Sequence, residues 1–393
     1  MSSTNHAQAK VSRDKPSKTS PKTSGTSSNP AIIVAVKTAR PQLSILKPTT
    51  PKPAPEAWIP LDRYEDLKAL VHGAEAHTSI TKSLTTGQTF VVKRYWVVRK
   101  GKKNDPPPPT PPPINEAFIL LECLRPHPNI LRAFGFDNTP RRRHLYTEFC
   151  DGGDLADLAR QCAKEGTTCP EHVTLHVFVS LTHALAYLHR GLRWQPAAKT
   201  WEVEQDFSNK AGYIHGDIKP ANVFVRWTRE AEARGYPDVV LGDFGATQRA
   251  DRFYGASGTV GFMAPEVEAA FDSEDEDEDE YVGDGRGYMT LATDYFSLGQ
   301  TVHYLATNRK HVVGADPETL PVVDTEEGMI GVRLGSEPVY ETVALIEAVK
   351  ACLNPDSELR PTFVGGWSNL LEAVAACQEA LEVLLAKYRA GEL

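Results

Sequence analysis

Three short polar motifs follow one another in a fixed order in the second half of the chain. The run His-Gly-Asp-Ile-Lys-Pro-Ala-Asn-Val occupies residues 215–223, Asp-Phe-Gly occupies residues 243–245, and Ala-Pro-Glu occupies residues 264–266. Any one of them has an ordinary explanation, such as an Asp that caps a turn, so a single match carries little weight. The ordered set is typical of phosphoryl transfer, in which the protein mainly positions a hydroxyl and neutralises phosphate charge.

These motifs resemble those of the eukaryotic protein kinase superfamily, and in particular its Ser/Thr members. The resemblance implies that Asp217 accepts the proton of the substrate hydroxyl and that Lys219 reaches the γ-phosphate of ATP. It also implies that Asn222 and Asp243 are the metal ligands. Magnesium prefers a few hard oxygen ligands, which one Asn and one Asp supply. ATP and Mg²⁺ are therefore the expected cofactors.

A lysine and a glutamate upstream complete the expected phosphate site. Residues 89–98 are rich in β-branched and aromatic side chains, which predicts a strand. Lys93 in this strand is either an exposed lysine or, by resemblance, the ligand of the α- and β-phosphates. The family pairs that lysine with a helical Glu. Glu116 and Glu122 compete for this role, and we prefer Glu116 because its distance to the turn at residues 127–130 is about that of the family.

The glycine-rich loop departs from the family pattern. The family expects G-x-G-x-x-G-x-V, and residues 73–80 keep only Gly73, with Ile80 at the end of the aligned stretch. By resemblance, Gly73 and Ile80 are nucleotide contacts. Glycines let backbone N–H groups approach phosphate without a Cβ in the way. Glu75 adds a negative charge near the triphosphate instead, so the sequence predicts weak binding of ATP.

Residues 144–150 read as another strand, which a Gly-Gly turn follows. The resemblance makes this segment the adenine-binding hinge, with Thr147 as the gatekeeper and with backbone contacts at Glu148 and Cys150. Asp154 then lies near the ribose. An N-cap at Asp154 is the ordinary explanation of that residue, and the two interpretations are compatible.

Three further residues match structural positions of the family. Asp294 resembles the buried helix Asp that braces the catalytic loop, and Arg360 resembles the Arg that forms a salt bridge with Glu266. Removal of one partner from a buried ion pair costs about 3–5 kcal/mol, so these residues are expected to matter for folding.

The resemblance implies an α+β, bilobal protein-kinase-like fold, in which a small antiparallel β-sheet lobe with one main helix joins a larger, mostly helical lobe. Residues 62–150 would form the smaller lobe and residues 151–386 the larger one, which ends in an apolar, amphipathic helix. Residues 1–55 are rich in Ser, Thr, Pro and Lys, which predicts a disordered tail rather than an Arg-rich transit peptide. Four inserts are recognised, at residues 105–113, 191–211, 228–237 and 272–280.

Two of these inserts suggest partners. The proline-rich insert 105–113 is either a ligand for an SH3 or WW module or a stiff linker. The acidic insert 272–280 either attracts a basic substrate or the basic tail, or is a solvated loop. The role of insert 191–211 is not readable from its sequence.

Composition limits the remaining function classes. The formal net charge of -8 gives no general case for nucleic-acid binding. No apolar run approaches the roughly 20 residues that cross a bilayer, and no secretory signal is visible, so no membrane contact is expected. The six cysteines are scattered without a C-x-x-C pair, which favours reduced thiols in the cytoplasm or nucleus.

The interpretation is thus ATP-dependent phosphorylation of Ser or Thr in a protein substrate. Lys219 after the expected base and Thr259 before the Ala-Pro-Glu motif both resemble Ser/Thr kinases. The alternative is a pseudokinase that binds nucleotide or acts as a scaffold. The altered glycine loop, the proline-rich insert and the acidic insert favour it, and the presence of Lys93, Asp217, Asn222 and Asp243 opposes it.

Regulation has its own sequence signal. Many relatives carry Arg where this chain has Gly216, and that Arg pairs with a phosphate on the activation loop. The hypothesis is activity that does not depend on phosphorylation of this loop. Arg249 or Arg252 replaces the missing cation in the alternative hypothesis.

Overall fold

The computed structural model describes residues 64–72, 76–96, 115–139, 142–205, 207, 211–252, 255–272, 289–310, 340–363 and 369–392. All of them belong to one unit of the chain. Several sequence predictions therefore lie outside the described residues, namely those on the tail, the proline-rich insert, Gly73, Glu75 and the acidic residues after Asp272.

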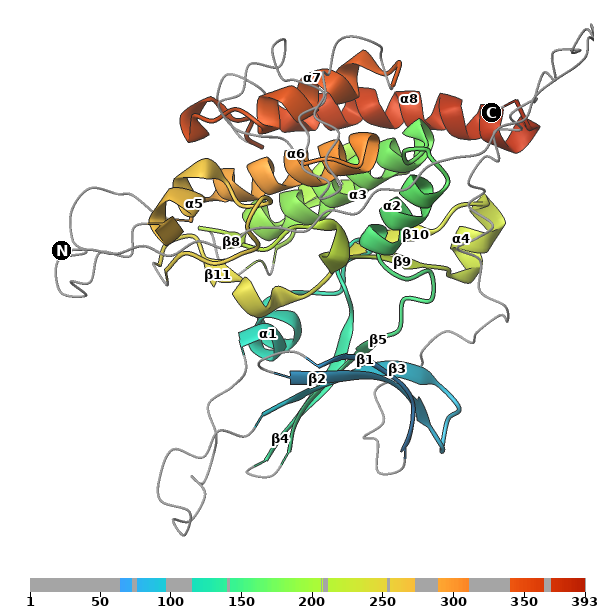
Figure 1. The fold of residues 1–393 in the computed structure, drawn as a ribbon, viewed down its shortest axis with the longest axis vertical. Helices are drawn as coiled ribbons and strands as arrows, with labels where there is room; N and C mark the ends of the chain where they lie inside the picture. The colour runs from blue at the N-terminus through green and yellow to red at the C-terminus, as the bar shows by residue number, and fades with distance from the viewer. Residues whose placement is uncertain are drawn as a thin grey trace, which may run out of the picture. The chain divides into compact units, whose positions relative to one another are not determined.

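A five-stranded antiparallel sheet comes first, with strand order β1-β2-β3-β5-β4 (Figure 1). Its strands are β1 (Tyr64–His72), β2 (Ala76–Ser83), β3 (Thr89–Tyr95), β4 (Ala133–Thr139) and β5 (Arg142–Glu148). Successive strand residues point to opposite faces, so Val91 and Lys93 share one face of β3 while Phe90 and Val92 are buried on the other. The predicted strand at residues 144–150 ends earlier than expected, at Glu148.

One short helical segment follows the sheet's third strand. It consists of a single α-helical turn, α1 (Asn115–Phe118), and a π-helical stretch, η2 (Ile119–Cys123), which the bond from Leu124 N–H to the Ile119 carbonyl closes. Glu116, Ala117, Ile119 and Leu120 are buried. Apolar burial therefore stabilises this segment, because a helix this short is marginal by itself.

The rest of the described chain is mainly helical. Its helices are α2 (Leu155–Lys164), α3 (Glu171–Arg190), α4 (Arg229–Arg234), α5 (Pro265–Asp272), α6 (Leu291–Thr307), α7 (Val343–Cys352) and α8 (Leu370–Ala390). Helices α3 and α6 are buried along most of their lengths and lie side by side, with α7 and α8 packed against them (Figure 1). A helix that is apolar all round needs such cover on every side. The predicted terminal helix is present and continues to Ala390.

Short strand pairs carry the motif segments. β8 (Tyr213–Ile214) pairs with β11 (Gln248–Arg249), and β9 (Val223–Arg226) pairs with β10 (Asp238–Leu241). The first motif lies between β8 and β9 and contains the 3₁₀ turn η3 (Pro220–Asn222), and a second such turn, η4 (Phe244–Ala246), follows Asp243. The polar residues of both motifs therefore lie close to strand ends: the first motif begins after β8, and Asp243 follows β10.

Two predicted inserts have a clear structure. The insert at residues 228–237 contains α4, which lengthens the hairpin of β9 and β10. The insert at residues 191–211 forms a hairpin of β6 (Leu192–Gln195) and β7 (Thr200–Val203), in which Trp194 lies opposite Trp201.

The observed architecture confirms the prediction of an α+β, protein-kinase-like fold with a small antiparallel sheet and a larger helical part. All six cysteines are free. In the ranges that the structure describes, every helix is too short or too polar to serve as a membrane span.

Candidate active site

Asp294 on α6 holds the backbone of the first motif, residues 215–223, which is called the catalytic loop by its resemblance to the kinase family. Its fully buried carboxylate accepts hydrogen bonds from the His215 N–H at 2.7 Å and the Gly216 N–H at 3.0 Å. The imidazole nitrogen Nε2 of His189 lies 2.9 Å from the same carboxylate. The prediction that Asp294 braces this loop is confirmed, and the loop backbone is fixed before its side chains are considered.

Asp217 lies in a closed set of side-chain hydrogen bonds. The Lys219 ammonium donates to Asp217 Oδ2 at 2.7 Å and to Thr259 Oγ1 at 2.6 Å. The Thr259 hydroxyl donates in turn to Asp217 Oδ1 at 2.7 Å. Asn222 Nδ2 adds bonds to the Asp217 carbonyl at 2.8 Å and to Oδ2 at 2.9 Å. These contacts bring together residues of the first motif and a threonine about forty positions later, and they orient the Asp217 carboxylate.

Lys93 on β3 bridges two acids from distant parts of the chain. Its ammonium lies 2.8 Å from Glu116 Oε2 and 2.8 Å from Asp243 Oδ1. Burial alone would lower the pKa of Lys93, but the two carboxylates outweigh this effect and raise the pKa above its usual value. The structure thus pairs Lys93 with the buried Glu116, whereas Glu122 is exposed.

Asp243 is held in a conformation that few residues adopt. Its φ of 59° lies in the left-handed region, and Phe244 behind it is fully buried against the His215 ring, with the ring centroids 4.8 Å apart. The Phe244 N–H donates to Glu116 Oε1 at 3.3 Å. Burial would raise the pKa of Asp243, but Lys93 overcomes that effect and lowers the pKa, so the side chain is a carboxylate at neutral pH.

The donor set suits magnesium. The amide nitrogen of Asn222 faces Asp217, which leaves the amide oxygen for a cation, and Asp243 supplies an ionised carboxylate. Within the described residues, no group of three or more His, Cys, Asp or Glu side chains forms an all-protein metal cage. Magnesium usually binds one or two carboxylates together with substrate phosphates, so the two predicted ligands fit it.

The predicted nucleotide contacts on the sheet lie around Lys93. Ile80 pairs with Val91 across β2 and β3, and Thr147 pairs with Val91 across β3 and β5, so all of them share the face of Lys93. Thr147 is buried, and the buried Cys150 follows the end of β5. The predicted hinge therefore borders the face of the sheet that carries Lys93.

Asp154 caps α2, as its ordinary explanation predicted. Its Oδ1 accepts a hydrogen bond from the Asp157 N–H at 2.9 Å, and burial raises the pKa of this carboxyl. The cap fixes the start of α2 directly after the predicted hinge.

Arg360 and Glu266 form the predicted salt bridge. The guanidinium makes two parallel bonds to the carboxylate, of 2.7 and 2.8 Å, and the Arg360 side chain is fully buried. Such bidentate pairs are among the stronger polar contacts in proteins. This prediction is confirmed.

Sequence reasoning missed two polar contacts near the site. Arg226 on β9 donates to both carboxylate oxygens of Glu148, at 2.9 and 2.8 Å, and so ties β9 to the end of β5. Asn115 at the start of α1 donates to two backbone carbonyls after Asp243. The position of Asn115 directly before Glu116 was the signal available in the sequence.

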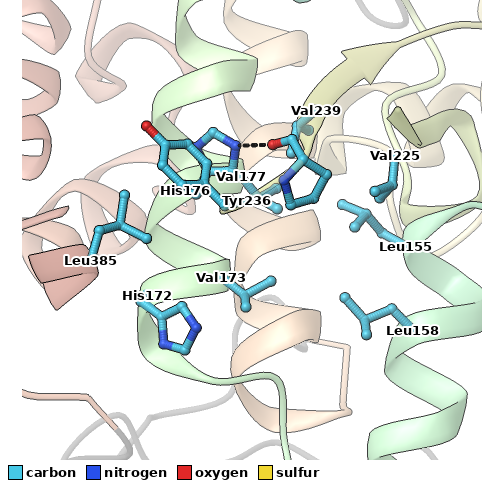
Figure 2. Close-up of a pocket in the computed structure, with 11 residues that line it drawn as sticks. Leu155, Leu158, His172, Val173, His176, Val177, Val225, Tyr236, Val239 and Leu385 are labelled. Atoms are coloured by element: carbon cyan, nitrogen blue, oxygen red, sulfur yellow. Dashed lines mark hydrogen bonds between the residues drawn. The ribbon is translucent and has the colours of Figure 1, made fainter. Parts of the chain in front are cut away.

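A hollow lies away from these residues, between α2, α3, β9, β10 and α8. Figure 2 shows it lined mostly by apolar side chains, with His176 Nε2 2.8 Å from the Pro237 carbonyl. None of the predicted site residues lines it. It is therefore a packing feature of the helical part and not the candidate active site.

Comparisons with known proteins agree with this geometry. Residues 64–193 match the family model of the protein kinase domain. The chain is 25% identical over 311 residues to the G2-specific protein kinase nim-1 of Neurospora crassa, which covers 76% of this chain and 32% of that protein. It is 33% identical over 216 residues to the G2-specific protein kinase fin1 of Schizosaccharomyces pombe, covering 53% of this chain and 27% of the relative.

A human relative extends the comparison. Over 146 residues the chain is 32% identical to the serine/threonine-protein kinase Nek2 of Homo sapiens, covering 36% of this chain and 28% of Nek2. The chain thus spans about a third or less of the length of these three relatives. The domain match, the relatives, the fold and the ordered motifs agree that the chain is similar to the eukaryotic protein kinase superfamily.

Proposed function

We propose that this chain is an active protein serine/threonine kinase that transfers the γ-phosphoryl group of ATP to a protein hydroxyl. One observation carries the proposal: Lys93 contacts Glu116 and Asp243 at the same time. Kinase turnover requires both the strand lysine–helix glutamate pair and the aspartate of the second motif in place. These two contacts support the proposal.

The residues of the chain then divide the work. Asp217 accepts the proton of the substrate hydroxyl, and the bonds from Thr259 and Asn222 aim its carboxylate. Lys219 lies beside Asp217 and would neutralise charge on the transferred group. Lys93 holds the α- and β-phosphates. Magnesium, bound by Asn222 and Asp243, would neutralise charge on the phosphates when present.

The choice of Ser and Thr as acceptors rests on two residues. Lys219 and Thr259 are both within hydrogen-bond distance of Asp217, and both resemble Ser/Thr kinases at their positions. The relatives named above include a serine/threonine-protein kinase by name. These facts support a Ser/Thr substrate rather than a tyrosine.

The finer assignments belong to the same proposal. The adenine would lie between Ile80, Thr147 and the backbone at Glu148 and Cys150, with Asp154 near the ribose and Gly73 near the phosphates. Residues 62–150 and 151–386 are the proposed lobes. A basic protein substrate is proposed from the acidic run that begins at Asp272, an SH3 or WW partner from the proline-rich insert, and a cytoplasmic or nuclear location from the cysteine usage.

A pseudokinase is the second candidate, because only one glycine of the nucleotide loop is kept. A scaffold has no need, however, for Lys93, Asp217, Asn222 and Asp243 together. Their mutual contacts make the active enzyme the better supported of the two.

The test is phosphoryl transfer by the Asp217→Asn variant, with radiolabelled ATP and purified protein. We expect the variant to fold but to lose activity by about 10²–10⁴-fold, the usual contribution of a general base. Lys93→Met should also impair turnover, because the phosphates lose their ligand. Asp356→Asn is the matched control, since this exposed Asp caps a short 3₁₀ turn far along the chain and Asn caps equally well. Wild-type activity in Asp217→Asn would refute the enzymatic function.

A further inference from the structure

One side-chain amide joins α1 to the segment that follows Asp243. Asn115 Nδ2 donates to the Thr247 carbonyl at 2.7 Å and to the Gly245 carbonyl at 3.2 Å. Asn115 directly precedes Glu116, whose carboxylate contacts both Lys93 and the Phe244 N–H. The helix α1 is therefore linked to the second motif in two ways. Asn115 binds backbone carbonyls of that segment, and Glu116 binds Lys93, which in turn contacts Asp243.

The other side of this segment is fastened to the catalytic loop. Thr247 is buried, and its hydroxyl lies 3.3 Å from the His215 carbonyl, to which it donates. The next residue, Gln248, pairs with Ile214 in the two-stranded ladder of β11 and β8. Residues 245–248 are thus held between α1 and the catalytic loop by hydrogen bonds of neutral groups.

The position that usually supplies a cation here disfavours any side chain. Gly216 has a φ of +81°, and a Cβ on it would lie 2.4 Å from Met289 Cε and 3.0 Å from the Ala246 carbonyl. A side chain at this position would be strained and would press on the fastened segment. Arg249, the nearest basic residue of the segment, is already paired with Asp251 at 2.7 Å.

We infer that Asn115 is a positioning residue that holds the second motif in its active arrangement without a phosphate. The inference rests on the kinase activity proposed above. Asn115 takes the place of a phosphate–arginine contact by tying the Gly245 and Thr247 carbonyls to the helix of Glu116, which keeps Asp243 within reach of Lys93.

The experiment compares Asn115→Ala, Asn115→Asp and Asn115→Gln in the full chain. Loss of two hydrogen bonds predicts a fall in kcat of about 5- to 50-fold for Asn115→Ala. Asn115→Asp should fall further, because a carboxylate would face two carbonyl oxygens, whereas Asn115→Gln keeps the donor and should recover part of kcat. Glu122→Gln, an exposed residue of the same helical segment, is the control and should match wild type.

Two further measurements separate positioning from simple destabilisation. Amide hydrogen exchange of residues 244–248 should rise in Asn115→Ala while the unfolding midpoint stays near that of wild type. This measurement does not need catalysis. If the wild-type protein has no kinase activity but amide exchange still rises in Asn115→Ala, the kinase function is rejected and the role of Asn115 is kept. Unchanged exchange and kcat in both Ala and Asp variants would overturn that role.

Phosphatase treatment completes the test. Wild-type activity should survive it, and so should the activity of a variant that carries both Tyr254→Ala and Ser257→Ala. A large loss in both would show that a phosphate orders the segment and that Asn115 does not replace it.

Discussion

Two buried carboxylates organise the candidate site from opposite parts of the molecule. Asp294 lies on α6 in the helical part, and Glu116 lies on α1 beside the sheet; both are almost fully buried. Asp294 accepts from two backbone N–H groups and lies against His189. Glu116 accepts from the side chains of Lys93 and Tyr95 and from one backbone N–H, that of Phe244.

The elements that carry them differ. Helix α6 has 17 residues, most of them buried, whereas α1 has four residues and continues only as a five-residue π-helical stretch. Asp294 thus fixes backbone from a long, packed helix. Glu116 mainly holds the long side chain of Lys93. It does so from a short helix whose first residue, Asn115, binds the Thr247 carbonyl.

The two carboxylates are therefore expected to have different roles, Asp294 in the stability of the fold and Glu116 in the arrangement of the site. Loss of Asp294 leaves buried backbone donors unsatisfied, which the fold cannot tolerate easily. Loss of the Glu116 contact frees an ammonium that is partly exposed and can be solvated. We therefore expect the catalytic loop to be a fixed part of the site and the Lys93–Glu116 pair to be the part that regulation can reach.

The largest expected effect is that of Asp294→Ala. One buried and one partly buried backbone N–H group and His189 lose their acceptor, so the free energy of unfolding should fall by about 3–5 kcal/mol. Urea unfolding followed by circular dichroism measures this loss. Glu116→Gln is the contrasting variant: it should unfold near the wild-type midpoint but lose most phosphoryl transfer. Equal stability losses in the two variants would break the comparison.

Acidification should destabilise the helical part next. Burial lowers the pKa of His172 and His183 on α3 to about 4, and burial beside Arg193 lowers that of His127 to about 3. Each is lower than the unfolded value near 6.5, so the unfolded chain binds more protons and stability falls as pH drops below about 6.5. At pH 5.5 the loss should be about 1 kcal/mol for each such histidine.

The measurement is the urea midpoint between pH 7.5 and pH 5.5. His183 Nε2 lies 2.9 Å from Gln378 Nε2, and the amide can donate only to an unprotonated ring nitrogen. His183→Gln removes this titration and should flatten the pH dependence by about one histidine's share. A midpoint that does not change with pH in wild type would contradict the burial of these rings as neutral groups.

The smallest expected effect concerns the nucleotide loop. With Glu75 where the family has glycine, ATP should bind in the upper part of the usual KM range of roughly 1 μM–1 mM. Glu75→Gly removes a charge and a Cβ and should tighten binding a few-fold, about 1 kcal/mol or less. Calorimetry with ATP and magnesium tests this, with Glu65→Gln on β1 as an exposed control. Unchanged or weaker binding would mean that the loop differs from the family alignment.

Prediction from the sequence was most complete where contacts are short in sequence. The first motif spans nine residues, and the contacts among Asp217, Lys219 and Asn222 follow from that spacing once the turn forms. Element boundaries were less accurate, as the early end of β5 and the longer α8 show. Fraying and local packing decide such ends, and a periodic pattern does not contain them.

Polar contacts between residues far apart in the sequence could not be predicted from the sequence alone. Arg226 binds Glu148 across 78 positions, and Asn115 binds the Thr247 carbonyl across 132. Neither contact has a motif, because each depends on how two separate elements pack. The hairpin of β6 and β7 was likewise unreadable, since its strands are short and mixed in polarity.

The sequence by itself determined the residue types and their order: a lysine on a strand, a glutamate on a helix, and two acids and an amide in ordered motifs. Only the tertiary structure decided that Lys93 meets Glu116, 23 positions away, and Asp243, 150 positions away, at 2.8 Å each. The physical reason is that such distances depend on the packing of the sheet, α1 and the catalytic loop around buried Phe244 and Asp294, which no local pattern specifies.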